Sequence, residues 1–175
     1  MSKEIEYLVE DVEKFLQLNN EDTDTSSTSL RKLLSVQDKI KIFENIDPLE
    51  LQAIVYDVKF ERYKHKDHIV DQGQLKKEIY FILDGECQAF FNTTKIGTLK
   101  TSEVFGESGA IFGTKRNATV LCASASATLL TFKIDEDNME FCAPALAILY
   151  KNLALQINKK LNSLNAKVEA KKIMP

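Results

Sequence analysis

The chain has 175 residues, of which 44% are hydrophobic and 28% are charged, and its formal net charge is −3. This composition is typical of an ordinary globular protein of about one domain, and the weak negative charge offers no attraction for nucleic acid or an anionic membrane. No apolar run approaches the roughly 20 residues that span a bilayer, and the acidic start MSKEIEYLVEDVEKF is not typical of a secretory signal. We therefore expect a cytoplasmic protein without nucleic-acid or membrane partners.

The first part of the chain reads as a helix followed by a linker. Over 3–18 the apolar residues recur at the spacing of one helix face. The run NEDTDTSSTS at 20–29 is short, polar and rich in Ser and Thr, which is typical of a linker. We therefore divide the chain into an N-terminal helix and linker, 1–29, and a single domain, 30–175.

Two further helices are expected before the first strand. One begins at Leu30, with Ser29 as its cap, and runs to Ile46. The next is short, because Asp47 is placed as an N-cap and Pro48 as the first helical residue.

Short β-type runs dominate the segment 55–134. Seven or eight of them follow one another, among them VYDVKFERY, EIYFILDG, ATVLCAS and ATLLTFKI, with glycine or asparagine between several of them. No β-type run alternates with a long helix, which argues against a doubly wound α/β fold. The pattern predicts a mainly β fold: an antiparallel β-barrel or jelly roll with flanking N-terminal helices and a C-terminal hinge or lid helix.

Helical spacing returns over 135–167. Acidic residues open this part in IDEDNMEF, where the helix dipole favours them, and Pro144 begins or kinks a second helix. From Leu146 to Leu164 apolar residues recur every three or four positions. One face can pack on the barrel, while another is available to a second subunit or a protein partner.

The cysteines and histidines do not indicate a metal site. The three cysteines lie far apart in apolar surroundings, without a CxxC pair, and we expect buried thiols: Cys87, Cys122 and Cys142. His65 and His68 flank Asp67, but no fourth ligand is near them in the sequence. Because no GxSxG, Walker motif or catalytic carboxylate pair is found, we expect no enzyme; a metal-dependent jelly-roll enzyme is a weak third possibility.

The stretch 105–120, FGESGAIFGTKRNATV, is the most informative part of the sequence. Gly106 permits a close turn, and Glu107 opens a short helix whose first N–H groups lack internal partners. Gly109 lets an oxygen approach its amide, and Arg116 can pair with the same anion. A carboxylate accepts hydrogen bonds, so Glu107 suits a sugar hydroxyl. The combination predicts a phosphorylated sugar, although a simple surface ion pair between Glu107 and Arg116 remains open.

The order of residues in this stretch resembles the phosphate-binding cassette of cyclic nucleotide-binding domains. That family includes regulatory subunits of cyclic-nucleotide-dependent kinases, gated channels, and bacterial regulators such as catabolite activator protein. The resemblance extends over about 43–165, through FENIDPLELQAIV, YKHKDHIV and DQGQLKKEIYFILDGECQAF. Two departures are Lys66, where the family usually has glycine, and Gly109, where alanine or serine is commoner.

The resemblance implies a role for each residue of the cassette. Glu107 would accept from the ribose 2′-hydroxyl, Arg116 would pair with the cyclic phosphate, and Ala118 would leave room for the ligand. The amides of Gly109 and Ala110 would complete the phosphate site. The full expected ligand-binding set is Gly106, Glu107, Ser108, Gly109, Ala110, Arg116, Asn117 and Ala118. Cyclic AMP is favoured over cyclic GMP only as the commoner bacterial case, since Asn117 does not decide between them.

We therefore predict a stand-alone cyclic nucleotide sensor of bacterial type, without a metal. Its C-terminal helix would move when ligand enters and would signal to a dimer mate or a partner, since the sequence ends at 175 without a helix-turn-helix segment. Asn152 or Gln156 could reach the base. The alternative is an interaction or structural module with a vestigial pocket, in which Glu107 and Arg116 would pair with each other.

Overall fold

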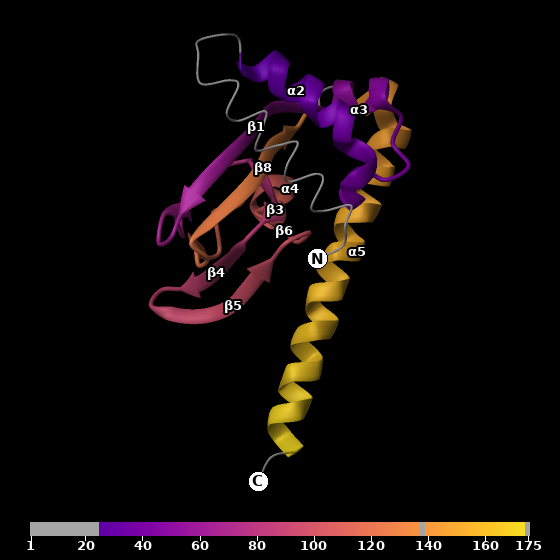
Figure 1. Ribbon diagram of the computed structural model, residues 1–175. Helices are drawn as coiled ribbons and strands as arrows, with labels where there is room; N and C mark the ends of the chain where they lie inside the picture. Colours follow the sequence, from indigo (N-terminus) through magenta and orange to yellow (C-terminus); the bar gives the residue numbers. More distant parts are fainter. Residues whose placement is uncertain (1–24, 137–138, 174–175) are drawn as a thin grey trace.

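The computed structural model describes residues 25–136 and 139–173, and within them two four-stranded sheets lie beside a group of helices (Figure 1). The helix expected at 3–18 lies outside these residues. The helical segments are α2 (Thr25–Val36), η1 (Gln37–Lys39), η2 (Lys41–Phe43), α3 (Pro48–Ile54), α4 (Glu107–Phe112) and α5 (Met139–Ile173). The strands are β1 (Val55–Lys64), β2 (His68–Val70), β3 (Ile79–Asp84), β4 (Glu86–Phe91), β5 (Thr94–Lys100), β6 (Val104–Phe105), β7 (Thr119–Cys122) and β8 (Ser126–Ile134).

The two sheets are antiparallel and have the orders β1-β8-β3-β6 and β2-β7-β4-β5. Strands distant in the sequence are neighbours in both: β1 pairs with β8 along its length, and β4 lies between β5 and β7. The prediction of a mainly β jelly-roll barrel with flanking helices is therefore confirmed. The chain runs from β6, the last strand of one sheet, through α4 and then to β7 in the other sheet.

Strand β3 separates the two apolar cores of the domain. Residues 79–83 are all buried, although a strand with one wet face would alternate. Ile79 and Phe81 face the core under the helices, whereas Tyr80 and Ile82 face the barrel interior. Burial on both faces explains the unbroken apolar run IYFIL, and it divides the side chains of β3 between the two cores.

The predicted linker at 20–29 is wrong over its last five residues. Helix α2 begins at Thr25, and Ser29, expected as a cap, lies inside the helix with 6% of its surface exposed. The Ser/Thr-rich sequence has low helix propensity, but Leu33 and Val36 bury their side chains in the core beneath the helices. Tertiary burial thus overrides local propensity here, as it often does.

The single long helix expected from Leu30 to Ile46 is also wrong. Helix α2 ends at Val36 and is followed by the two 3₁₀ turns η1 and η2. Ile40, Ile42 and Phe43 are all buried, and their spacing does not fit one face of an α-helix. The 3₁₀ turns bring all three side chains inward, and buried Gln37 stabilises the bend by donating from Nε2 to the Ile46 carbonyl at 3.0 Å.

Helix α3 begins as expected, because the Asp47 carboxylate accepts from the amides of Leu49 and Glu50 and Pro48 is the first helical residue.

Helix α5 is bent at Cys142, which has non-helical dihedral angles two residues before Pro144. The helix continues to Ile173, beyond the end expected at 167.

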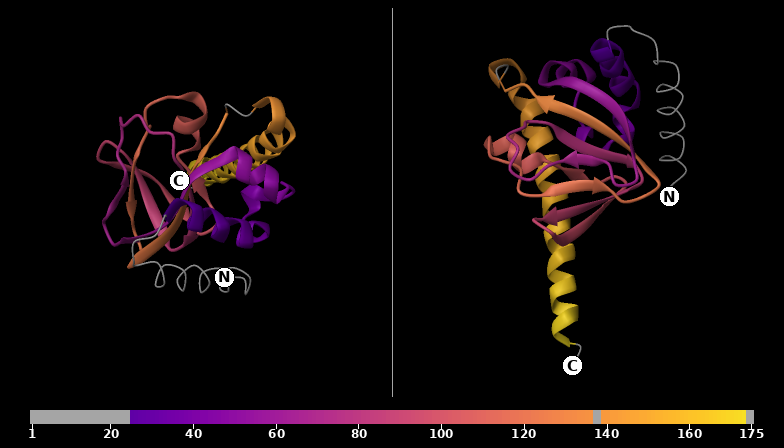
Figure 2. Two further views of the ribbon diagram at one scale, coloured as in Figure 1. Left: turned by 90° about the horizontal axis from the view of Figure 1, so that it is seen from above. Right: turned by 90° about the vertical axis from the view of Figure 1, so that its left-hand side faces the viewer.

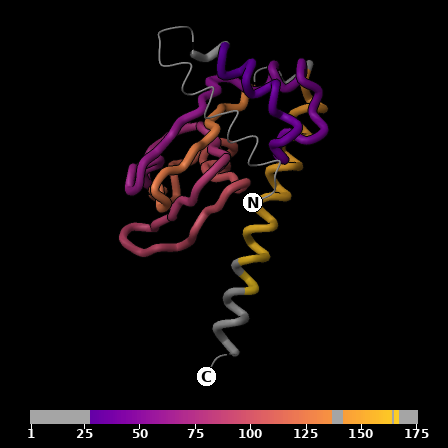
Figure 3. The backbone as a smooth tube through the Cα atoms, viewed as in Figure 1, coloured from indigo at the N-terminus to yellow at the C-terminus, as the bar shows by residue number. Residues whose placement is uncertain are grey.

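Helices α2 and α3 flank the first part of α5 at one side of the sheets, and α5 then runs past the lower edge of the barrel (Figures 2 and 3). Leu149 and Leu153 are buried in the core that α5 shares with α2 and α3. In the part of the chain that the structure describes, no helix combines the length and apolar character required to cross a bilayer.

Candidate functional site

Two glycines in left-handed conformations delimit α4. Gly106 has φ = 84° at its start and Gly113 has φ = 61° at its end, so the six-residue helix begins and stops sharply. A Cβ atom at Gly106 would lie 2.8 Å from Nη1 of Arg116 and 2.9 Å from the Glu78 carbonyl oxygen. The glycine at 106 is therefore required both by the backbone and by the close packing of Arg116.

Arg116, which packs against Gly106 at the start of α4, is buried, with only 4% of its surface exposed. Its Nη1 donates to the Gly106 carbonyl and its Nη2 to the Glu78 carbonyl, both at 2.5 Å. Its own backbone pairs with the loop before β3: its N–H donates to the Gln74 carbonyl at 2.8 Å, and its carbonyl accepts from Gly73 at 2.9 Å. The guanidinium thus ties the turn before α4 to the start of β3, while its Nε is buried without a hydrogen-bond partner among the described residues.

The ring of Tyr80 lies against the guanidinium and is itself stacked on another aromatic ring. Tyr80 on β3 and Phe105 on β6 are register partners whose rings stack at 4.9 Å, and the Arg116 guanidinium carbon lies 5.7 Å from the centre of the Tyr80 ring. Burial raises the pKa of Tyr80 to about 12, and the neighbouring Glu78 carboxylate adds to the shift. Tyr80 therefore stays neutral and acts as an apolar and cation–π support.

A series of alternating acidic and basic side chains extends from Arg116. The Glu78 carboxylate lies 3.6 Å from Arg116 Nη2 and 3.5 Å from the ammonium of Lys133, which in turn lies 2.8 Å from the Asp57 carboxylate. The hydrogen bond from Lys133 is the main reason why the pKa of Asp57 is lowered. The positive charge of Arg116 is thus partly balanced by Glu78, which is not among the residues lining the cavity described below.

Glu107, the first residue of α4, is bound by a lysine of the C-terminal helix. The Lys160 ammonium donates to Glu107 Oε1 at 2.9 Å and also to the backbone carbonyl of Val104 on β6. The side chains are 23% and 13% exposed, so this ion pair is largely shielded from water. Glu107 therefore pairs with Lys160 and Arg116 pairs with Glu78, instead of with each other as the vestigial-pocket alternative predicts.

These residues surround a cavity of about 270 Å³. Seven of the eight predicted site residues line it: Gly106, Glu107, Ser108, Gly109, Arg116, Asn117 and Ala118. The opposite wall is apolar and comes from β2, β4, β5, β6 and β7: Val70, Ala89, Ile96, Leu99, Phe105 and Val120. The cavity is thus charged at the α4 edge and apolar across the barrel, with Lys160 entering from α5.

Ala110, the eighth predicted residue, is placed differently. Its amide donates to the Gly106 carbonyl at 3.1 Å, and its side chain packs against the core beneath the helices. The amide that was expected to contribute to an anion site is thus the donor of the first hydrogen bond of α4. Asn152 is likewise directed elsewhere, since it donates to the carbonyls of Ile42 and Glu44.

The other candidate residues lie away from this cavity. His65 contacts the Ala123 carbonyl and His68 contacts Asp71, so the two rings have separate partners. The three cysteines are buried and free, as predicted, and burial raises the pKa of Cys87 to about 12. In the described ranges no group of three or more metal-ligating side chains comes together.

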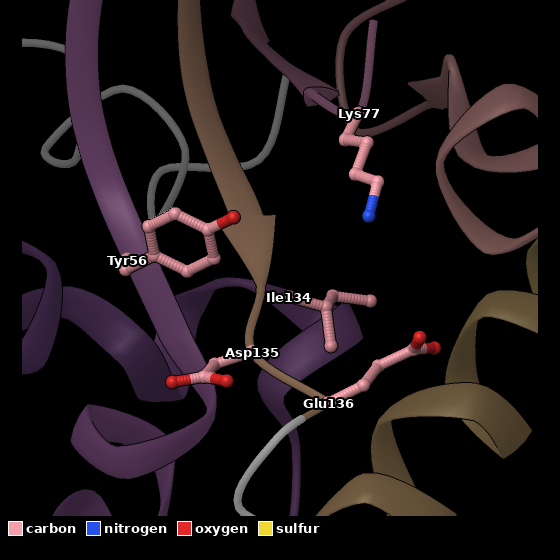
Figure 4. Close-up of a pocket in the computed structure, with 5 residues that line it drawn as sticks. All are labelled: Tyr56, Lys77, Ile134, Asp135 and Glu136. Carbon is pink, nitrogen blue, oxygen red and sulfur yellow. The ribbon is translucent and has the colours of Figure 1, made fainter. Parts of the chain in front are cut away.

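A second cavity, of about 330 Å³, lies where β1 and β8 meet the helices (Figure 4). Its lining residues are Tyr56, Lys77, Ile134, Asp135 and Glu136. Figure 4 shows Lys77 and Glu136 reaching the hollow from different segments, with Ile134 between them. The cavity is slightly larger than the one beside α4, but it contains none of the residues of the 105–120 stretch.

Sequence reasoning did not assign Glu78 or Lys160 to the site. Glu78 lies 38 residues before Arg116, and Lys160 lies 53 residues after Glu107, so local spacing gives no signal for either contact. The one available indication was that Lys160 interrupts the apolar stripe of the C-terminal helix. A charged residue at an apolar position of a packed helix is a reason to look for a buried partner.

Comparison with known proteins shows what the domain is similar to. A family model described as a cyclic nucleotide-binding domain matches residues 60–139, which include β3, α4 and Arg116. A cGMP-dependent protein kinase of Plasmodium berghei is 28% identical over 87 residues, covering 50% of this chain and 10% of the kinase. A human potassium/sodium hyperpolarization-activated cyclic nucleotide-gated channel 2 is 29% identical over 108 residues, covering 62% of this chain and 12% of the channel. The chain thus spans about a tenth of the length of these relatives.

Solved structures show the same fold. Thermus thermophilus catabolite activator protein has a TM-score of 0.53 at 19% identity, covering 75% of this chain and 63% of that protein. The regulatory domain of Toxoplasma gondii PKA, solved with cAMP, has a TM-score of 0.54 at 16% identity, covering 78% of this chain and 51% of that one. Residues 60–139 are thus similar to cyclic nucleotide-binding domains, and the solved structures share the jelly-roll fold of this chain.

Proposed function

We propose that this chain binds a cyclic nucleoside monophosphate in the cavity beside α4 and acts as a regulatory sensor domain. The observation that supports this best is the state of Arg116: a cation with 4% exposure lines the cavity, and its buried Nε has no hydrogen-bond partner among the described residues. A buried donor without a partner is costly, and a phosphate oxygen would satisfy it with a charge-assisted bond.

The phosphate position is set by Arg116 and Gly109. A Cβ atom at Gly109 would lie 3.2 Å from Nη1 of Arg116, so glycine leaves space between the backbone of α4 and the guanidinium. Nη1 and Nη2 each use one of their two N–H bonds on the carbonyls of Gly106 and Glu78, so Nε and the remaining Nη hydrogens are the donors available to the ligand. Arg116 therefore has two tasks in this proposal, one in the scaffold and one in the ligand site.

Glu107 is proposed to accept a hydrogen bond from the ribose 2′-hydroxyl. Its carboxylate lines the cavity on the same short helix as Gly109, and a sugar joined to a cyclic phosphate lies within a few ångströms of that phosphate. The Val104 carbonyl, which lies beside Glu107 through their shared contact with Lys160, is a second acceptor. Two acceptors suit the donor-rich edge of a ribose.

The base is proposed to lie on the apolar wall formed by Ala89, Ile96, Leu99 and Val120. A flat purine ring fits an apolar surface through burial and dispersion, which do not distinguish adenine from guanine. Asn117 is exposed, and it supplies no decision between cAMP and cGMP. Relatives and structural neighbours include a kinase named for cGMP and a regulatory domain solved with cAMP, so both ligands belong in the test.

Titration calorimetry of both nucleotides with Arg116→Lys and the wild type tests the site. Lysine keeps the positive charge but lacks the planar guanidinium and its Nε donor. Because hydrogen bonds to charged groups contribute about 1.5–3 kcal/mol, we expect nucleotide binding to weaken about tenfold to a hundredfold. Lys115→Ala, at the exposed neighbouring position, is the matched control. Unchanged affinity in Arg116→Lys would contradict the assigned role, and no binding of either nucleotide to the wild type at millimolar concentration would favour a vestigial pocket.

The regulatory part of the proposal rests on α5. Ligand entry beside α4 would change the contacts of α5 with the barrel, and a dimer mate or another protein would read that change. Assignment to a bacterial, cytoplasmic, stand-alone sensor stays a prediction, since the similar proteins named above include eukaryotic kinases and channels. No catalytic step is proposed, because the family match is to a binding domain.

A further inference from the structure

The C-terminal helix inserts one charged side chain into the proposed ligand site. Lys160 lines the cavity, and its ammonium bonds the Glu107 carboxylate at 2.9 Å and the Val104 carbonyl. In the proposed complex these same two acceptors face the sugar. An ammonium group donates several hydrogen bonds, as the hydroxyl groups of a ribose do. Lys160 therefore satisfies the same two acceptors that the sugar would satisfy in the proposed complex.

The exposed fractions along α5 show that few other side chains beyond Leu153 are buried near the Lys160 contact. Leu153 is 1% exposed, whereas the described side chains that follow are exposed except at Gln156 and Lys160. Leu155, Ile157 and Leu161 are 50%, 41% and 53% exposed, so apolar packing does not hold this part of the helix. The Lys160 pair therefore fastens the outer half of α5 to the barrel.

We propose that Lys160 is an internal competitor of the nucleotide for Glu107, and that binding of the sugar releases the outer half of α5. This inference rests on the proposed function, because it needs Glu107 to accept the sugar hydroxyl. The Lys160 ammonium occupies the place between the Glu107 carboxylate and the Val104 carbonyl that the sugar hydroxyl would take, so the two donors cannot be there at the same time. Ligand binding and helix attachment thus oppose each other through one carboxylate, which gives their coupling free energy a definite source.

The direction of the effect separates this proposal from a simpler role for Lys160. If the lysine added a favourable contact to the bound nucleotide, its removal would weaken binding. If it competes, its removal strengthens binding, because the binding-competent state no longer has to be reached by breaking the Glu107–Lys160 pair. In addition, the gain must vanish when Glu107 is absent.

The test is a double-mutant cycle measured by titration with cAMP and with cGMP. It uses the wild type, Lys160→Gln, Glu107→Ala and the double variant, with Lys159→Gln as the control for the same substitution at an exposed neighbouring site. We expect Lys160→Gln to bind about tenfold more tightly than the wild type, Lys159→Gln to match the wild type, and Lys160→Gln to give no gain in the Glu107→Ala background.

Amide hydrogen exchange without nucleotide tests the release of the helix. We expect faster exchange in α5 beyond Leu153 for Lys160→Gln than for Lys159→Gln, and equal exchange would overturn the claim that the pair fastens the helix. Equal or weaker nucleotide affinity in Lys160→Gln, beside measurable binding to the wild type, would overturn the competition. No binding to any of the five proteins would instead overturn the proposed function itself.

Discussion

Gly106 and Arg116 pack directly against each other, and the lack of a side chain at 106 is what allows the guanidinium to lie there. The glycine has φ = 84° and leaves the space in which the guanidinium reaches two backbone carbonyls. A larger residue at 106 would require both a left-handed conformation and a displaced arginine. Gly113, at the other end of α4, has φ = 61° but nothing within 4 Å of an added Cβ.

This contrast gives a prediction for two alanine substitutions. Gly113→Ala should cost about 1–2 kcal/mol, the usual strain of a left-handed non-glycine residue, whereas Gly106→Ala should cost at least about 1 kcal/mol more, because the Glu78 carbonyl and Arg116 must also shift. Urea unfolding of both variants measures the difference. Equal losses for the two would contradict the close approach at Gly106.

At this scale the sequence was informative about only some of the residues that make the site. The order of residues in 105–120 predicted seven of the cavity-lining residues, because they belong to one turn, one short helix and the segment after it. Glu78 and Lys160 reach the site through tertiary contacts across 38 and 53 residues, which local spacing does not encode. The amide of Ala110, expected to face the ligand, donates to the Gly106 carbonyl as the first hydrogen bond of α4.

Among the elements, β1 contains an irregularity that connects it to the candidate site through a series of charged side chains. Its register with β8 shifts between Tyr56 and Lys59, and Asp57 in this bulge has φ = 51°. The bulge directs the Asp57 carboxylate toward Lys133, 2.8 Å away, and Lys133 also contacts Glu78 beside Arg116. A strand distant from α4 thus contributes to the charge balance of the arginine.

The lowered pKa of Asp57 predicts how stability depends on pH. Since this pKa is lower in the folded than in the unfolded chain, the contribution is complete above the ordinary value of 3.8 and is lost as the pH falls through the folded value. Asparagine tolerates the same backbone, so Asp57→Asn should lower the free energy of unfolding by about 0.5–1 kcal/mol at pH 7.

Chemical denaturation at a series of pH values checks this prediction. The deficit of Asp57→Asn should shrink as the pH falls below about 4, and it should also shrink in 1 M salt, because the pair is partly exposed and therefore screened. A deficit that stays constant at low pH would show that the loss comes from packing instead of charge.

The elements of the barrel were easier to predict than the helices before it. Short β-branched and aromatic runs separated by turn residues report the strands directly, and the two-sided burial of β3 is visible in its unbroken apolar run. The segment 37–46 was misjudged because its apolar residues suit two 3₁₀ turns, and the start of α2 because burial of Leu33 and Val36 outweighs the Ser/Thr composition.

At the scale of the whole molecule, the described part of the chain contains two apolar cores that share β3. Helix α5 completes the core that lies beneath the helices. Leu149 and Leu153 are 0% and 1% exposed in the core that also contains residues of α2, α3, β1 and β8. The inner part of α5 is thus part of the folded domain, whereas Leu161 further along the same helix is 53% exposed.

A pair of leucine truncations should reveal this division. Leu153→Ala should destabilise the protein by about 2–5 kcal/mol through lost burial and a residual cavity, and Leu161→Ala should change stability by less than about 0.5 kcal/mol. Thermal unfolding at equal protein concentrations compares them. A large loss in Leu161→Ala that grows on dilution would instead reveal a contact between copies of the chain.

The kinked, projecting helix also has a mechanical consequence. From Leu153 to Ala166 an α-helix extends about 20 Å at 1.5 Å per residue. If Leu153 is the pivot, a tilt of about 10° carries Ala166 through roughly 3.5 Å by this geometry. If the Glu107–Lys160 contact near the middle of this segment is lost as proposed, even a small tilt at Leu153 would therefore displace the end of the helix by several ångströms.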